Sequence, residues 1–197
     1  YITGENREAI ENSPHLEFVK NKGYNVLFLI DRIDEFILPY LMDFKEIPIK
    51  SVEKADIEID TTQKEETSKK ESKYKELFAV LKENLKDEIS EVKISSRLTE
   101  SVSCLVAAED SMTKNMEQML KSMGQAIPKN KRILEINPNH AVLNSMQAIY
   151  SKNKKDPQIK DFALLLYNQA LLTEGSKIKN SQGFAKIINN LLIKATK

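Results

Sequence analysis

Three acidic side chains, Asp31, Asp34 and Glu35, stand together in the segment DRIDE, directly after an apolar run. Carboxylates at the C-terminal end of a strand are suitable ligands for Mg²⁺, so one hypothesis is an acidic, magnesium-binding enzyme domain centred on them. The alternative is that they occupy the first turn of a helix, where each acidic side chain stabilises the helix dipole by about 0.3–1 kcal/mol. The pattern favours the second interpretation and leaves the first open to test.

The other residue types that carry chemistry are few, and their spacing matches no catalytic or metal-binding motif. His15 follows Ser-Pro and His140 follows Asn-Pro-Asn, so both are expected to cap helices or to make local hydrogen bonds. Cys104 lies in the apolar run CLVAA, which predicts a buried thiol, and a single cysteine fits a reducing, cytoplasmic location. The chain contains neither a glycine-rich phosphate loop nor a nucleophile elbow. We therefore expect no catalytic residue, bound metal or cofactor in this chain.

Four of the six methionines fall in the segment SMTKNMEQMLKSMG, residues 111–124. In a helix, Met112, Met116, Met119 and Met123 lie within a sector of about 60°, and nearly all the other positions are polar. The pattern therefore predicts a helix with one narrow apolar stripe. Such a stripe is either part of a core or an exposed surface that contacts other proteins.

The distribution of charge divides the chain into two parts. Residues 1–60 carry 7 basic and 13 acidic side chains, whereas residues 61–197 carry 23 basic and 16 acidic ones. This asymmetry predicts two structural units, and residues 61–73, which are polar throughout, predict a linker or a solvated helix start between them. The lysines of the second part are mixed with glutamates and form no aromatic–basic motif, so no nucleic-acid partner is expected. No apolar run approaches 18 residues, so no membrane partner is expected either.

Helix and strand patterns alternate over residues 1–60, which predicts a small α/β layer. YITG begins as a strand, and Ser13-Pro14 then starts a helix that Gly23 ends. The remaining pattern predicts a strand covered on both faces, a helix with a bend near Pro39, and a further strand, at residues 25–30, 33–44 and 47–52.

Residues 74–197 predict an α+β domain with a short sheet. Strands are expected within residues 92–109 and at residues 131–136, and Asn139 is expected to cap the helix that follows. The first helix of this part has an apolar face made of Leu77, Phe78, Leu81, Leu85 and Ile89.

Two apolar helices, near residues 161–174 and 182–195, close the chain. A unit of this size has limited capacity to bury both of them, and the simplest solution is a second copy of the chain. Two helices from each copy would then form an intermolecular four-helix bundle. The alternative is that both helices pack into their own domain. The side chains expected in the dimer interface are Phe162, Leu165, Leu166, Leu172, Phe184, Ile187, Ile188, Leu191 and Leu192.

Several segments, in order along nearly the whole chain, together match one family. They are YITG, SPHLE, KGYNVLFL with DRIDEF, SSRLTES, CLVAAEDSMTKNMEQMLKSMG, KRILEINPNH and LLYNQALLTEG. In these segments the chain resembles the heat shock protein 90 chaperones, in their bacterial HtpG branch. The resemblance implies that residues 1–60 are the end of the middle domain. It also implies that residues 61–73 are a variable linker and that residues 74–197 are the C-terminal dimerisation domain.

The family that the chain resembles is an ATP-driven dimeric clamp that binds unfolded or partly folded client proteins. The resemblance implies that ATP and Mg²⁺ bind an N-terminal domain of the full-length protein, so this fragment is not expected to be an enzyme. It further implies that the methionine-rich helix faces the cleft between the two arms, where a flexible, polarizable side chain suits varied clients. The residues expected to contact clients are Phe36, Ile37, Met112, Met116, Met119, Leu120 and Met123.

Three features of the chain depart from the family pattern. Phe36 stands where bacterial relatives usually have tryptophan, and Val102-Ser103 replaces the usual proline and small residue. The ending IKATK lacks the acidic pentapeptide tail of eukaryotic cytosolic relatives, so docking of tetratricopeptide co-chaperones is not expected. A remaining alternative to the chaperone is a structural, dimeric adaptor that does not bind unfolded proteins.

Overall fold

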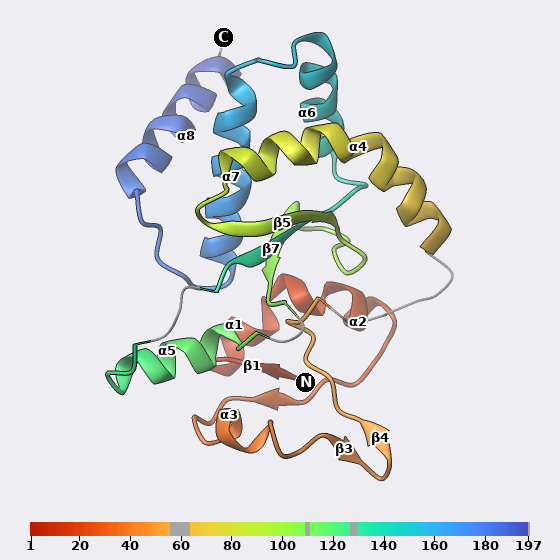
Figure 1. The fold of residues 1–197 in the computed structure, drawn as a ribbon, viewed down its shortest axis with the longest axis vertical. Helices are drawn as coiled ribbons and strands as arrows, with labels where there is room; N and C mark the ends of the chain where they lie inside the picture. The colour runs from red at the N-terminus through yellow and green to blue at the C-terminus, as the bar shows by residue number, and fades with distance from the viewer. Residues whose placement is uncertain (56–63, 109–110, 127–129, 197) are drawn as a thin grey trace.

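The computed structural model describes residues 1–55, 64–108, 111–126 and 130–196, with side chains described from residue 70 onward in the helix that begins at Lys64. Figure 1 shows residues 1–55 as a lower unit, called the first unit below, and most of the other described residues as an upper unit, called the second unit. Both units mix helices with small sheets, which confirms the predicted α+β class. None of the helices in the described residues combines the length and the apolar character that spanning a bilayer requires.

The first unit is built around a short parallel pair of strands. Ser13 Oγ accepts a hydrogen bond from His15 N at 3.3 Å, Pro14 occupies the first helical position, and Gly23 has a φ of 70° after the last turn, as predicted. The core side chains are Ile2, Ile10, Leu16, Phe18, Val19 and Val52. The elements are β1 (Ile2–Thr3), α1 (Arg7–Glu11), the 3₁₀ helix η1 (Pro14–Leu16), α2 (Glu17–Asn21), β2 (Phe28–Leu29), α3 (Asp34–Ile37), β3 (Asp43–Phe44) and β4 (Ile47–Pro48).

The prediction of a fully covered strand at residues 25–30 is wrong. Only Phe28 and Leu29 form a strand, which pairs in parallel with β1. Val26 and Phe28 pack against the core of the first unit, whereas Leu27, between them, is 59% exposed. This alternation has the period of a strand with one covered face, and a continuous apolar run does not reveal it.

The predicted helix at residues 33–44 is also too long. Helix α3 contains only Asp34–Ile37, and the chain leaves it before Pro39, which has no backbone N–H to continue the helical hydrogen bonds. The strand predicted at residues 47–52 is reduced to β4, which pairs with β3 in an antiparallel hairpin. Farther along, Val52 N donates to Tyr1 O at 2.9 Å and so ties this segment back to the beginning of the first unit.

The β3–β4 hairpin has a two-residue turn whose residues are unsuited to it. Lys45 and Glu46 have φ values of 52° and 66°, in the left-handed region that favours Gly and Asn. Replacing them with the pair Lys45→Asn and Glu46→Gly should therefore raise the free energy of unfolding by about 1 kcal/mol. Chemical denaturation measures the change, and Lys50→Asn, outside the turn, is the control. If the denaturation midpoint of the double variant were unchanged or lower, the left-handed turn at Lys45 and Glu46 would be contradicted.

The second unit has a three-stranded sheet with strand order β5-β7-β6. Strand β7 is central, parallel to β5 and antiparallel to β6. Strands β6 and β7 fall where the sequence predicts strands, and β5 does so only in its second half. Strand β5 begins at Ile89, which the apolar pattern had assigned to the preceding helix. The elements are α4 (Lys64–Asn84), β5 (Ile89–Ile94), β6 (Ser103–Val106), α5 (Lys114–Ser122), β7 (Arg132–Ile136), α6 (Ala141–Lys152), α7 (Gln158–Thr173) and α8 (Ser181–Ala195).

The two faces of this sheet are covered differently. Helices α4, α6 and α7 contribute to one large core with the sheet, as their placement in Figure 1 indicates. On the other face, Leu98, Cys104, Val106 and Ile133 form a smaller cluster that Ala55 of the first unit covers. Burial raises the pKa of the Cys104 thiol well above its usual value, so the side chain is a neutral, buried group, as the sequence predicts.

Two details around the second unit decide between alternatives that the sequence leaves open. The cap of α6 is His140, whose Nδ1 accepts a hydrogen bond from Val142 N at 3.2 Å, so the expectation for His140 is confirmed and that for Asn139 is wrong. Residues 64–73 of the predicted linker form the first half of α4, so this part of the segment is the start of a helix. Residues 61–63 lie outside the described part of the chain.

Candidate functional site

Helix α5 carries the predicted methionine stripe, and polar contacts fix its first turn. Thr113 caps the helix, since its Oγ1 accepts a hydrogen bond from Met116 N at 3.2 Å. The same hydroxyl donates to Glu35 Oε2 at 3.0 Å, and Asn115 Nδ2 donates to Thr3 Oγ1 at 2.9 Å. These bonds attach α5 to α3 and β1, so α5 lies beside the first unit in Figure 1.

The apolar stripe of α5 is not part of a core in this chain. Met112 and Met123 are 44% and 61% exposed, and Met116, Met119 and Leu120 are half-buried. The buried residues at the start of α5 are polar, with Thr113 and Glu117 facing the rest of the molecule. A helix attached by its polar side leaves its apolar side available to another molecule.

Phe36 and Ile37, the other two residues expected to contact clients, are exposed on α3. The neighbouring residue Glu35 is buried and bonds Thr113 at the start of α5, so the structure brings α3 and α5 together. Five of the seven residues expected to contact clients lie in these two adjoining helices, while Met112 precedes α5 and Met123 is its C-cap. We call the seven the α5–α3 apolar surface; they are Phe36, Ile37, Met112, Met116, Met119, Leu120 and Met123.

The acidic segment does not assemble a metal site among the described residues. Asp34 Oδ2 accepts a hydrogen bond from Asp31 N at 3.1 Å, and Asp34 and Glu35 occupy the first turn of α3. Glu35 instead turns towards Thr113, and the described part of the chain contains no group of three acidic, histidine or cysteine side chains placed to hold an ion. The arrangement is that of helix-start acids, the interpretation that the pattern favours.

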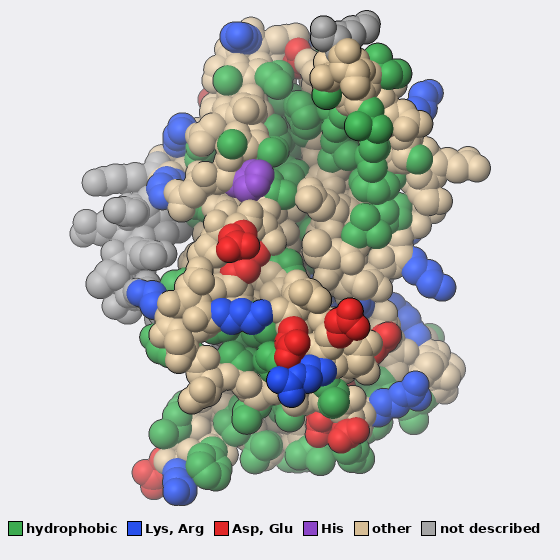
Figure 2. Space-filling model, turned by 180° about the vertical axis from the view of Figure 1, so that it is seen from behind, with side chains coloured by type: hydrophobic (Ala, Val, Ile, Leu, Met, Phe, Trp, Pro, Cys, Tyr) green, Lys and Arg blue, Asp and Glu red, His purple; other side chains and the backbone are tan. Residues whose placement is uncertain are grey.

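Helix α8 has an apolar stripe but no buried residue. Phe184, Ile187, Ile188 and Leu191 are half-buried, and Leu192 is 57% exposed. Figure 2 shows hydrophobic side chains gathered in a strip over this part of the molecule. A helix of 15 residues with no buried side chain is weakly held by its own chain, because most helical stability comes from the packing of the apolar face.

Helix α7 contributes less to this strip than the sequence suggests. Phe162 and Leu165 are half-buried and Leu172 is 52% exposed, but Leu166 is 3% exposed and belongs to the core of its own unit. Ile193 of α8 is exposed although the sequence analysis did not single it out, since it lies off the regular stripe. The exposed apolar strip therefore runs along α8, whereas Leu172 at the end of α7 lines a cavity against the first unit, with Thr3 and Ile10.

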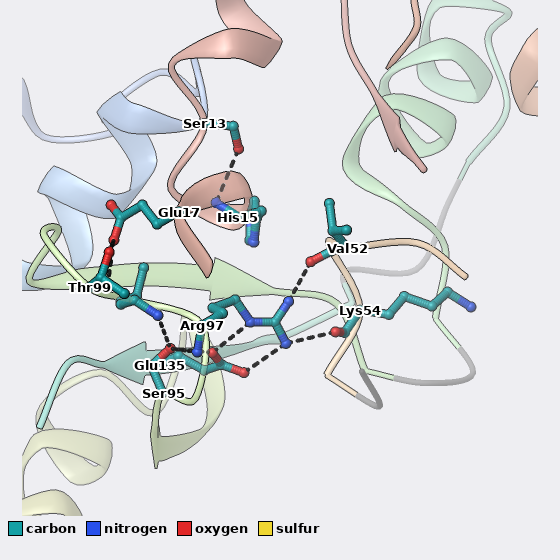
Figure 3. A network of polar contacts seen from close by, with 10 residues as sticks. Ser13, His15, Glu17, Val52, Lys54, Ser95, Arg97, Thr99 and Glu135 are labelled. Carbon is teal, nitrogen blue, oxygen red and sulfur yellow. Dashed lines mark hydrogen bonds and ion pairs between the residues drawn. The ribbon is translucent and has the colours of Figure 1, made fainter. Parts of the chain in front are cut away.

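A buried polar network joins the two units, and it was not predicted. Arg97 Nε donates to Glu135 Oε2 at 2.9 Å, and the same guanidinium donates to Lys54 O at 2.8 Å and to Val52 O (Figure 3). Arg97 is 1% exposed. The only hint in the sequence is that Glu135 interrupts the apolar strand RILEI, a position where a buried charge needs a partner.

A second contact across the junction uses the carboxylate of Glu17. Its oxygens accept hydrogen bonds from Thr99 N at 2.6 Å, Glu100 N at 2.8 Å and Ser101 N at 3.0 Å. Burial alone would raise the pKa of Glu17, but the hydrogen bonds outweigh burial and lower it, so the group is ionised at neutral pH. Nearby, burial and the positive charges of Arg97 and Arg132 lower the pKa of His15 to about 3, so its imidazole is neutral.

Glu53 makes the junction sensitive to pH. Burial raises the pKa of Glu53 to about 7, and the carboxylates of Glu35 and Glu174 add to the rise, while hydrogen bonds from Thr3 oppose it. The folded chain therefore holds a proton that the unfolded chain releases, and stability falls as pH rises from about 4.5 to about 7.

Glu53→Gln should remove this part of the pH dependence. At pH 8 the free energy of unfolding of the variant should be up to about 3 kcal/mol higher than that of the unmodified chain. Near pH 4.5 the two free energies should be alike. Urea denaturation at a series of pH values measures the difference, with Glu46→Gln on the exposed hairpin as the control. If the free energies of unfolding of Glu53→Gln and of the unmodified chain changed with pH in the same way, the pKa of Glu53 would not be raised by folding.

Comparison with known proteins shows which family the chain belongs to. The model of the Hsp90 protein family matches residues 1–197. The chain is 40% identical over 198 residues to the chaperone protein HtpG of Geobacter sulfurreducens and 39% identical to that of Geobacter metallireducens, with 98% of this chain covered in each case. It is 37% identical over 200 residues to the chaperone protein HtpG of Frankia casuarinae, with 99% covered. The chain spans about 30% of the length of these relatives. It therefore belongs to the Hsp90 family.

Proposed function

We propose that this chain is part of an ATP-dependent, HtpG-like chaperone and supplies both a dimer interface and a client-binding surface. In this proposal residues 1–60 end the middle domain, and residues 74–197 form the C-terminal dimerisation domain. ATP and Mg²⁺ bind an N-terminal domain that this chain does not contain, so the fragment hydrolyses nothing by itself. The membership of the family and the two exposed apolar surfaces support the proposal.

The observation that carries the proposal is the apolar face of α8, which its own chain leaves without a single buried residue. A second copy of the chain would cover α8 together with the half-buried Phe162 and Leu165 of α7. Two helices from each chain then form a four-helix bundle, with an obligate interface of about 2,000 Å² or more. The bundle would hold two arms together and leave α5 of each arm free.

The α5–α3 apolar surface would then face the space between the arms. Its methionines are unbranched and polarizable, so they repack against clients of different shape. Its flanks are polar, and a bound segment would exchange water for apolar contact over a limited area. The aromatic Phe36 adds a flat apolar side chain on the adjoining helix.

Replacing Met119 and Leu120 with serine should weaken client binding without unfolding the domain. Both side chains are half-buried, so we expect a loss of about 1 kcal/mol or less in unfolding free energy. We expect the chain to suppress aggregation of a chemically unfolded client and the double variant to suppress it markedly less. Val142→Ser, at an exposed apolar position on α6, is the control.

Two outcomes of this experiment would contradict the client-binding proposal. If the double variant lost several kcal/mol of stability, the stripe would be part of a core. If the unmodified chain formed dimers yet did not slow aggregation, the structural adaptor would be the better account. The magnesium-enzyme hypothesis has a separate test, since it requires that millimolar Mg²⁺ raise the melting temperature and that Asp31→Asn remove this effect.

A further inference from the structure

A cavity of about 560 Å³ lies between β1, the segment that joins β2 to α3, and one side of α5. Four charged residues line it, the acidic Glu5, Asp31 and Glu35 and the basic Arg32. Met119 of the α5–α3 apolar surface lines it as well, so the cavity opens beside the methionine stripe. Three carboxylates against one guanidinium give the cavity a net negative charge.

Glu35, which lines this cavity, has one unused acceptor among the described residues. The residue is 7% exposed, and its Oε2 accepts the hydrogen bond from Thr113 Oγ1. Its Oε1 is buried and has no hydrogen-bond partner among the described residues. A buried, charged acceptor without a donor is costly, because it loses its water without gaining a replacement bond.

The chemistry of the cavity selects a cation on an apolar stem. An anion would face three carboxylates, whereas an ammonium or guanidinium group would bring the opposite charge, and a rotation of the Glu35 side chain would offer it Oε1 as an acceptor. Apolar atoms of Leu29, Ile30 and Met119 line the same cavity and can contact the aliphatic part of a long basic side chain.

We propose that this cavity binds an arginine or lysine side chain of a client polypeptide whose neighbouring apolar residues lie on the methionine stripe. This inference rests on the proposed client-binding function and adds a preference to it. Clients would be selected for a basic residue next to an apolar one, rather than for apolar character alone. Arginine is the better fit, since its planar guanidinium forms two parallel hydrogen bonds with a carboxylate.

Among the described residues, Arg32 is the one basic residue that lines the cavity beside these carboxylates. It is exposed and lines the cavity, so its positive charge opposes the entry of a basic side chain. Arg32→Gln should therefore strengthen binding of a basic peptide. If Arg32 instead neutralised the cavity by itself, the unmodified chain would show no preference for a basic peptide.

Two peptides that differ in one atom group test the proposal. Both are unstructured and apolar, and one carries a central arginine where the other carries citrulline, its uncharged counterpart. Fluorescence polarisation with the unmodified chain should show that the arginine peptide binds about tenfold more tightly, the value of one charge-assisted hydrogen bond. The preference should fall with rising salt concentration.

Variants then locate the preference. Glu35→Gln keeps an oxygen for Thr113 and removes the charge, and Asp31→Asn changes an exposed side chain, so neither should unfold the chain. Each should reduce the preference to about twofold or less and leave citrulline-peptide binding unchanged, whereas the control Glu46→Gln should keep the full preference. The cavity proposal would be overturned if the two peptides bound the unmodified chain equally, or if the preference for arginine survived in both variants. Either result would leave the client-binding function intact. If neither peptide bound the unmodified chain, the client-binding function would fail and the cavity proposal with it.

Discussion

Replacing Arg97 with methionine should lower the free energy of unfolding by about 3–5 kcal/mol. The Arg97 residue is 1% exposed, and its guanidinium donates hydrogen bonds to the Glu135 carboxylate, Val52 O and Lys54 O. A methionine side chain has no N–H group with which to replace these bonds. The substitution would leave the carboxylate of Glu135 buried without its positive partner, which costs more than the ion pair contributes. Chemical denaturation monitored by circular dichroism measures the loss.

A second variant separates the cost of the unpaired Glu135 charge from the cost of the lost side-chain packing. In Arg97→Met with Glu135→Leu, no unpaired charge remains, so we expect most of the lost stability to return. Arg97→Lys should fall between the two, since an ammonium group cannot bridge one carboxylate and two carbonyls in the same plane. If Arg97→Met cost less than about 1 kcal/mol, the network in Figure 3 would not be what holds the two units together.

The pair Leu191→Glu and Leu192→Glu should convert the proposed dimer into single chains. Both side chains lie on the uncovered stripe of α8, and in a four-helix bundle each glutamate would be buried without a partner. Because the single chain leaves Leu192 exposed and Leu191 half-buried, the isolated unit should keep its fold. Light scattering at micromolar concentration measures the mass, and circular dichroism confirms that the helices remain.

The control for this variant lies on the same helix. Asn189→Glu with Asn190→Glu introduces the same charge at two exposed polar positions away from the stripe. We expect this variant to behave as the unmodified chain. A dimer that persisted in the Leu191 and Leu192 variant would show that the two chains meet through another surface.

Elements with a regular pattern and their own boundary residues were predictable from the sequence. Strand β7 and helix α5 appear where the pattern predicts them, and Thr113 and Gly124 mark the two ends of α5. The prediction of a strand covered on both faces at residues 25–30 is wrong, because an unbroken apolar run does not tell whether one or both faces of a strand are covered.

The contacts between the units could not be predicted in the same way. Arg97 meets partners that are 38 to 45 residues away, and nothing local to Arg97 indicates that it is buried. Glu35 looked like an ordinary helix-start acid, yet its bond to Thr113 spans 78 residues and places α5 against α3. Such contacts depend on how elements pack, which periodicity alone does not describe.

The central claim is that two copies of the chain pair through α7 and α8 and leave the α5–α3 apolar surface free. The mass of the unmodified chain in solution tests this claim most directly. Light scattering coupled to gel filtration at micromolar concentration should give twice the 22.5 kDa of one chain. A particle with the mass of a single chain at that concentration would contradict the pairing through α7 and α8.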